Sequence, residues 1–188
     1  MRSIPENHPD LLAVILTEYG NKSFIGGADI AEMASLDSPA AAWEFITKVH
    51  AACQSIRDFP VPMIGRINGY ALGAGLEIAA SCDFGVASRN AVFGMPEVNV
   101  GIPSVVEAAL LPGLVGWGRT RRLLMLGDNI SAVEALQWGL AEKVVEPNHL
   151  DHAVDKWVQI PERSGPARRS PPEEAHSAVG TAGLGCRY

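Results

Sequence analysis

The chain has 188 residues, of which 47% are hydrophobic and 19% are charged, and its formal net charge is −6. This length and composition predict one globular domain with a sizeable core. The acidic balance argues against a nucleic-acid-binding surface, and the lack of any run of about 18 apolar residues argues against a membrane span.

The cysteines, Cys53, Cys82 and Cys186, are odd in number and widely spaced, and no CxxC pair occurs. This pattern argues against a disulfide framework or a zinc site and fits a reducing compartment. Residues 1–10 lack the apolar core of a signal peptide. We therefore expect a protein of the cytoplasm, or of the mitochondrial or peroxisomal matrix in a eukaryote, rather than a secreted one.

The first predicted element is a strand over residues 11–17, whose continuous apolar run is typical of a strand buried on both faces in a parallel sheet. A polar loop follows over residues 19–23. Residues 24–30 form a glycine-containing turn, and helix-prone residues continue from there to about Leu36.

A long amphipathic helix is predicted from Ser38-Pro39 to Phe59, with the serine as N-cap and the proline in the first turn. Apolar side chains recur along it at spacings of three or four residues: Trp43, Ile46, Val49, Cys53 and Ile56. His50 lies off this stripe, so we expect it on the surface.

Residues 65–83 organise the rest of the chain, because a strand over 61–67 leads here into a glycine-rich turn and a short buried helix. The helical run 76–80 is apolar except for Glu77, and a buried carboxylate is costly unless it is paired or hydrogen-bonded. The N–H of Ala74 lies at the expected helix start, where unpaired donors favour an anion. On this stretch alone, the alternative is a packing turn with a solvent-facing Glu77.

The second half of the chain alternates strands and helices, which implies βαβ units and a mainly parallel sheet. A capping box of Ser131 and Glu134 begins one of these helices. The predicted strands are 83–88 and 143–146, with a further segment 91–97 after a turn, and the predicted helices are 105–111, 117–126, 131–139 and 150–160.

The domain core is expected to span residues 1–160. Residues 161–188 differ in composition, because proline, glycine and serine supply 11 of these 28 residues. Such a segment cannot bury enough apolar surface to offset its ordering entropy, so we predict a disordered or aberrant tail.

Two glycine turns, 26–29 and 73–75, each end at a predicted helix start. One backbone N–H from each turn could converge on a single oxygen and form an oxyanion hole. Two carboxylates, Glu77 and Glu97, lie in otherwise apolar, glycine-rich surroundings, where an acid or base could act beside a carbonyl.

Three segments resemble the signature blocks of the enoyl-CoA hydratase/isomerase (crotonase) family: FIGGADIAEM (24–33), NGYALGAGLEIAASCD (68–83) and FGMPEVNVG (93–101). The resemblance runs from about residue 11 to residue 160. It implies an α/β fold, the crotonase-like spiral of βαβ units with a mainly parallel sheet. It also assigns the two oxyanion donors to Ala28 and Ala74, within a substrate-binding set that includes Gly27, Asp29, Ile30, Gly73 and Gly75.

The resemblance further implies that Glu77 and Glu97 hold and activate one water, as the two glutamates of the family's hydratases do. Glu97 would exchange the proton at Cα, and Glu77 would direct the water to Cβ of a trans-2-enoyl-CoA. The family needs no metal or cofactor beyond coenzyme A within the acyl-CoA substrate, and it forms trimers or dimers of trimers. Two alternatives stay open: an isomerase or other CoA-thioester chemistry, and an inactive remnant that binds acyl-CoA or assembles with relatives.

The sequence also departs from the family pattern. The family's first strands and helix are missing before residue 11, and its last helices are replaced by the segment 161–188. Ala31 stands where a lysine is common. Residues 102–111 (IPSVVEAALL) differ from the usual glycine-rich version and bring a third acid, Glu107, near the site. We expect Glu107, on a helix, to face the surface.

Overall fold

The structure is a computed structural model that describes residues 11–164, apart from residues 21, 103 and 105. The predictions for residues 1–10, for Cys186 and for most of the tail, 165–188, lie outside the described residues. Within the described part, no helix has both the length and the apolar character that crossing a membrane requires.

One sheet has four strands in the order β1-β3-β5-β8, all of them parallel. They are β1 (Val14–Leu16), β3 (Met63–Ile67), β5 (Phe84–Ser88) and β8 (Lys143–Val145). Each occurs where an apolar run of the sequence predicted a strand, so the mainly parallel α/β architecture is confirmed.

A second sheet has the order β2-β4-β6-β7, parallel except for the antiparallel pair β6–β7. Its strands are β2 (Ser23–Ile25), β4 (Tyr70–Leu72), β6 (Val92–Gly94) and β7 (Asn129–Ser131). The sequence predicted β2 and β4 as loop and turn, and β7 was not predicted. Three residues are too few to show a periodicity, and these strands exist because they pair with distant segments.

The helices are α2 (Ile30–Ala34), α3 (Pro39–Arg57), α4 (Ala74–Ser81), α5 (Leu111–Val115), α6 (Trp117–Leu126), α7 (Ala132–Trp138) and α8 (Leu150–Ser164), with 3-10 turns η1 (Pro96–Val100), η2 (Ala108–Leu110) and η3 (Pro147–His149). The Ser38 cap, the bounds of α6 and the Ser131–Glu134 capping box match their predictions. The predicted helix 105–111 is wrong in position, since η2 begins only at Ala108. Helix α8 continues four residues beyond the predicted end of the core.

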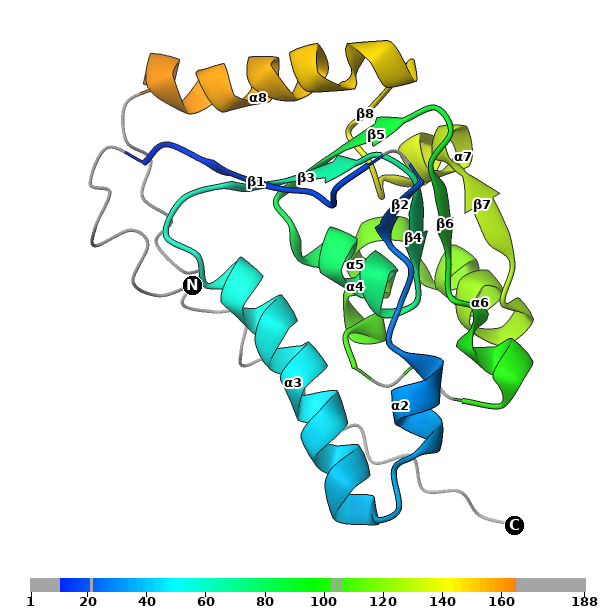
Figure 1. Cartoon of the computed structure of the whole chain (residues 1–188). Coiled ribbons are helices and arrows are strands. Elements are labelled where there is room, and N and C mark those ends of the chain that lie inside the picture. The colour runs from blue at the N-terminus through cyan, green and yellow to red at the C-terminus, as the bar shows by residue number, and fades with distance from the viewer. Residues whose placement is uncertain (1–10, 21, 103, 105, 165–188) are drawn as a thin grey trace.

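The first sheet separates two packing layers. Ile64 of β3 and Val86 of β5 pack against α8, which lies along one face of the sheet (Figure 1). Met63, the neighbour of Ile64 in β3, packs instead with residues at the end of α3, as alternation along a strand requires. Helix α4 packs against α3 on this second side and continues into the main core.

Gly75 determines how closely α4 approaches the second sheet. A Cβ at this position would lie 2.0 Å from the carbonyl oxygen of Ile25 in β2. The helix can therefore sit directly on the end of β2 only because residue 75 has no side chain. This close packing brings the start of α4 beside the turn that follows β2, so both glycine turns border the same space.

Candidate active site

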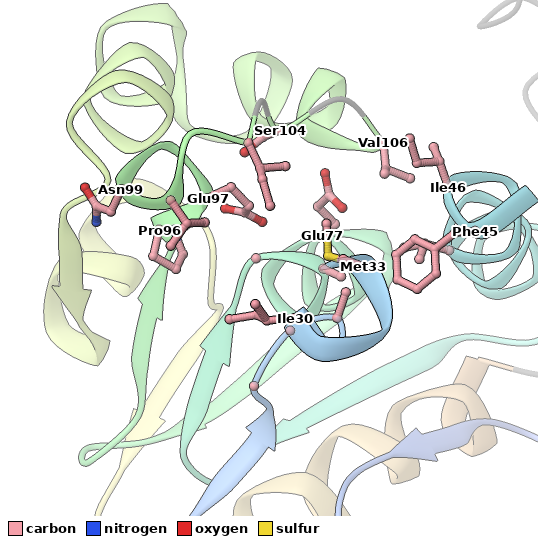
Figure 2. Close-up of a pocket in the computed structure, with 18 residues that line it drawn as sticks. Ile30, Met33, Phe45, Ile46, Glu77, Pro96, Glu97, Asn99, Ser104 and Val106 are labelled. Atoms are coloured by element: carbon pink, nitrogen blue, oxygen red, sulfur yellow. The ribbon is translucent and has the colours of Figure 1, made fainter. Parts of the chain in front are cut away.

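A cavity of about 270 Å³ lies between the two glycine turns. Its walls come from α2, α3, α4, η1 and the segment after η1, and they are largely apolar (Figure 2). The residues that line it are Gly26, Gly27, Ala28, Ile30, Met33, Phe45, Ile46, Val49, Gly73, Ala74, Glu77, Pro96, Glu97, Asn99, Val100, Ile102, Ser104 and Val106.

Two backbone N–H groups that border this cavity have no acceptor within the described segments. Ala28 follows Gly27, which has a φ of +114°, and Ala74 follows Gly73, which has a φ of +54°. Neither the Ala28 nor the Ala74 N–H donates a hydrogen bond to another described residue. Ala74 is also the first residue of α4, where the helix leaves its N–H groups free. These two amides can bind an oxygen atom of a ligand in the cavity.

Two residues of the predicted binding set do not line the cavity. Asp29 caps α2, because its Oδ1 accepts hydrogen bonds from the N–H groups of Ala31 at 2.8 Å and Glu32 at 3.2 Å. Gly75 packs against β2 instead. Gly27, Ile30 and Gly73 do line the cavity. The glycine blocks thus combine residues that face the ligand space with residues that shape the backbone around it.

Glu77 is a buried acid, with only 3% of its surface exposed, which excludes the solvent-facing alternative. Its Oε1 accepts a hydrogen bond of 2.9 Å from the backbone N–H of Glu107. Burial raises the pKa of Glu77 from its usual 4.5 to about 7, the Glu107 N–H opposes this rise, and the nearby Glu97 charge adds to it. A carboxyl with a pKa near neutrality can both accept and return a proton at physiological pH.

Glu97 lies on η1 and is half-buried in the same cavity, where Figure 2 shows its carboxyl group beside that of Glu77. Its Oε2 is buried and has no hydrogen-bond partner among the residues that the structure describes. The other oxygen packs over the second glycine turn, since a Cβ on Gly73 would lie 2.4 Å from Oε1. Unpaired buried oxygens are uncommon in folded proteins, and this one has bonding capacity left for a ligand or a water.

Glu107 was expected on the surface, and that prediction is wrong: only 5% of this residue is exposed. Arg57 of α3 donates to both of its carboxylate oxygens, at 2.8 and 3.2 Å, and the His50 Nδ1 lies 2.5 Å from Oε1. The side chain of His50 is 54% exposed, as expected. The sequence held one signal, since positions 50 and 57 are two turns apart on one helix face and place two basic groups there.

The described residues hold no group of three or more His, Cys, Asp or Glu side chains that could bind a metal ion. The described residues that line the cavity bring to it the two carboxylates, the two free amides and the side chains of Asn99 and Ser104. Such a set can bind a carbonyl oxygen and transfer protons beside it.

Comparison with known proteins adds a family assignment to this geometry. The family model described as enoyl-CoA hydratase/isomerase matches residues 4–169. The short-chain-enoyl-CoA hydratase of Clostridium acetobutylicum is 44% identical over 146 residues, which are 77% of this chain and 56% of that protein. The crotonyl-CoA hydratase of Syntrophomonas wolfei is 44% identical over 149 residues, or 79% and 57% of the two chains.

A solved structure of similar fold is the enoyl-CoA hydratase from Bacillus anthracis, with a TM-score of 0.80 and 31% identity. The match covers 88% of this chain and 65% of that one. The crotonase-like fold expected from the three blocks is thereby confirmed. The chain spans just over half the length of the two hydratases named above.

Proposed function

This chain belongs to the enoyl-CoA hydratase/isomerase family, and on that premise we propose that it adds water to a trans-2-enoyl-CoA thioester. One observation carries the proposal: two buried or half-buried carboxylates and two free backbone amides border the same apolar cavity. The two hydratases at 44% identity support the same reaction.

In the proposed mechanism, the thioester oxygen is bound by the N–H groups of Ala28 and Ala74. Attack at Cβ moves an electron pair through Cα onto this oxygen, and the two donors stabilise the resulting enolate. Removing one donor from such a hole typically raises the barrier by about 2.7–4 kcal/mol. The start of α4 adds the positive end of a short helix at the point where the negative charge develops.

Glu77 and Glu97 hold one water between them in this proposal. The cycle begins with Glu77 ionised and Glu97 protonated. Glu77 accepts a proton from the water as the water oxygen bonds to Cβ, and Glu97 gives its proton to Cα. The proton on Glu77 then returns to Glu97, so the net change is the addition of one water. The product is the 3-hydroxyacyl-CoA, and every atom comes from the ester and the water, so the reaction needs no cofactor besides the coenzyme A of the substrate. A base with a pKa of about 7 suits this task near neutral pH.

The acyl chain is proposed to lie along the apolar wall of the cavity. Met33 of α2 and Phe45, Ile46 and Val49 of α3 form this wall and supply no charge. Burying a short hydrocarbon chain against them is favourable by about 0.8 kcal/mol for each methylene group.

The test is the loss of enoyl-thioester absorbance when the protein is mixed with crotonyl-CoA. We expect Glu97→Gln to lower kcat by about a hundredfold or more, because the general acid is lost while the shape is kept. Glu44→Gln is the matched control, since Glu44 is an exposed acid that pairs with Lys48 on α3. Full activity in Glu97→Gln would overturn the assigned role.

A second candidate is double-bond isomerisation, because the same two acids can remove a proton from one carbon of the enoyl thioester, which gives a dienolate, and return it to another carbon. Product mass separates the two reactions, since hydration adds one water and isomerisation adds none. A third candidate is a protein that binds acyl-CoA in the same cavity without turnover. Thermal protection by acyl-CoA with no product would favour it.

We also propose a homotrimer or a dimer of trimers. Helix α6 exposes large apolar side chains, with Trp117 70%, Met125 69% and Leu126 62% exposed. Aromatic and methionine side chains of this kind are enriched at protein interfaces, which supports assembly.

A further inference from the structure

A buried acid outside the proposed reaction connects α3 to the active site. His50, Arg57 and Glu107, here called the Glu107 cluster, join helix α3 to the segment between η1 and η2. Arg57 binds Glu107 through two hydrogen bonds, from Nη1 to Oε2 at 2.8 Å and from Nη2 to Oε1 at 3.2 Å. The His50 Nδ1 lies 2.5 Å from Oε1. Both carboxylate oxygens are therefore hydrogen-bonded to α3, and Glu107 is not among the residues that line the cavity.

The main chain of the same residue contacts the proposed base. The N–H of Glu107 donates to Oε1 of Glu77 at 2.9 Å, and both partners are buried. The side chain of Glu107 is thus held by α3 while its backbone holds an acid of α4. Glu107 also stands directly before η2, so its position sets where that 3-10 turn begins.

We propose that Glu107 is a positioning residue, whose ion pair with Arg57 fixes the backbone N–H that orients the carboxylate of Glu77. The proposal rests on the proposed function for its effect on catalysis, but its structural part stands on the contacts alone. A buried ion pair is by itself weak evidence for stability, since desolvation offsets much of the attraction. Its link to Glu77 gives it a second role, because a misplaced catalytic group costs rate.

The proposal predicts that Glu107→Ala and Glu107→Gln shift the pKa of Glu77 in opposite directions. The Glu107 N–H lowers the pKa of Glu77, whereas the negative charge of the Glu107 side chain raises it more weakly. Among the described residues, Glu97 on η1, the Cys53 thiol on α3 and the backbone N–H of Ala108 also interact with Glu77, and the Ala108 N–H lowers its pKa as the Glu107 N–H does. Glu97 and Cys53 are unchanged by a substitution at residue 107. A shift in the titration of Glu77 therefore reports the charge of residue 107 and the placement of the adjacent backbone donors of residues 107 and 108.

In Glu107→Ala, the backbone is released, and we expect the titration midpoint of Glu77 to rise. In Glu107→Gln, the amide oxygen can still accept from Arg57 and the amide N–H can face His50, so the backbone stays in place and only the charge is lost. The midpoint should then fall slightly. The midpoint is measured by carbon-13 NMR of the Glu77 carboxyl, identified by the signal that Glu77→Gln removes.

Turnover of crotonyl-CoA provides the second readout. We expect Glu107→Ala to lower kcat by about ten- to hundredfold with KM nearly unchanged, and Glu107→Gln to retain most of the activity. Glu44→Ala removes an equal charge from the exposed face of α3 and should move neither the midpoint nor kcat. Arg57→Ala should act like Glu107→Ala, and the double variant should cost little more than either one.

The proposal is overturned if Glu107→Ala leaves the Glu77 midpoint where Glu44→Ala leaves it, or if Glu107→Ala and Glu107→Gln shift it equally. A wild-type protein without hydratase activity would refute the proposed function. The NMR titration would still test the positioning role, because it needs no turnover. If Glu107→Ala does not fold, Glu107→Gln and Arg57→Lys give the comparison, since a lysine cannot replace both hydrogen bonds of the guanidinium.

Discussion

The two acids of the cavity lie on different kinds of secondary structure and differ in burial and hydrogen bonding. Glu77 lies within the eight-residue helix α4, is buried, and accepts a hydrogen bond from the main chain of another segment. Glu97 lies on the 3-10 turn η1, is half-buried, and has one oxygen without a hydrogen-bond partner in the described part of the chain. The fold has thus set the orientation of one acid in advance and has left bonding capacity on the other.

This difference suggests a division of labour. A carboxyl that is buried beside another acid shifts its pKa toward neutrality and suits a base that is regenerated at each turnover. A carboxyl with an unused oxygen can accept a water or deliver a proton as the ligand requires. Gly73 contacts both regions, because it directly precedes α4, which carries Glu77, and lies against the carboxylate of Glu97.

Gly73→Ala should have the largest effect on the difference between Glu77 and Glu97. The new Cβ would lie 2.4 Å from Oε1 of Glu97, and the φ of +54° would strain any side chain. Backbone strain of about 1–3 kcal/mol accounts for the expected loss of stability, because the atom that clashes is the end of the Glu97 side chain, which can move away. We expect turnover to fall about a hundredfold as well, because Glu97 must move. Urea unfolding and crotonyl-CoA kinetics measure the two effects.

Gly113→Ala is the matched control for that substitution. Gly113 lies in α5, a Cβ there meets nothing within 4 Å, and its φ is not positive. Alanine at such a site should raise stability by about 0.4–1 kcal/mol through the unfolded state. Equal losses in the two variants would show that Gly73 has no special contact with Glu97.

The pH dependence of the free energy of unfolding tests whether burial raises the pKa of Glu77. The pKa of Glu77 is about 7 in the folded protein and near 4.5 when exposed, so the folded state keeps a proton that the unfolded chain loses. The stabilising contribution is therefore present below about pH 4.5 and is lost as the pH rises to about 7, a change of roughly 3 kcal/mol.

Glu77→Gln should remove this slope and make the protein more stable than the wild type above pH 7, while abolishing turnover. Denaturant unfolding at several pH values measures it, with Glu44→Gln as the exposed control. A slope that survives in Glu77→Gln would assign the titration to another group and contradict the raised pKa.

The smallest expected effect comes from a region that touches neither acid. Ser131 caps α7, where its Oγ accepts from the Glu134 N–H and its own N–H donates to the Glu134 carboxylate. Ser131→Ala should lower the free energy of unfolding by about 1 kcal/mol and leave kcat unchanged. A drop in kcat would mean that the start of α7 affects the cavity. The properties of Glu77 and Glu97 would then depend on more than the residues around them.

Much of the local structure could be predicted from the sequence because its signals are short-range. The Ser38 and Ser131 caps and the length of α6 follow from residues a few positions apart. The strands β2, β4 and β7 could not be predicted in this way. Their hydrogen bonds go to partners far along the chain, such as Ser23 with Tyr70 and Ile130 with Phe93.

Some features of the candidate site can likewise be predicted from the sequence, and others cannot. The glycine turns, the two acids and the family resemblance are all visible in the sequence, since each is carried by a block of contiguous residues. The burial of Glu107 is not visible in the sequence, nor is the fact that Asp29 and Gly75 do not line the cavity. Both depend on which distant segments pack together. Local patterns therefore identify the proposed catalytic groups and their order along the chain. Which of these groups face one cavity depends on the folded chain, because the surroundings of a side chain come from contacts between segments that lie far apart in the sequence.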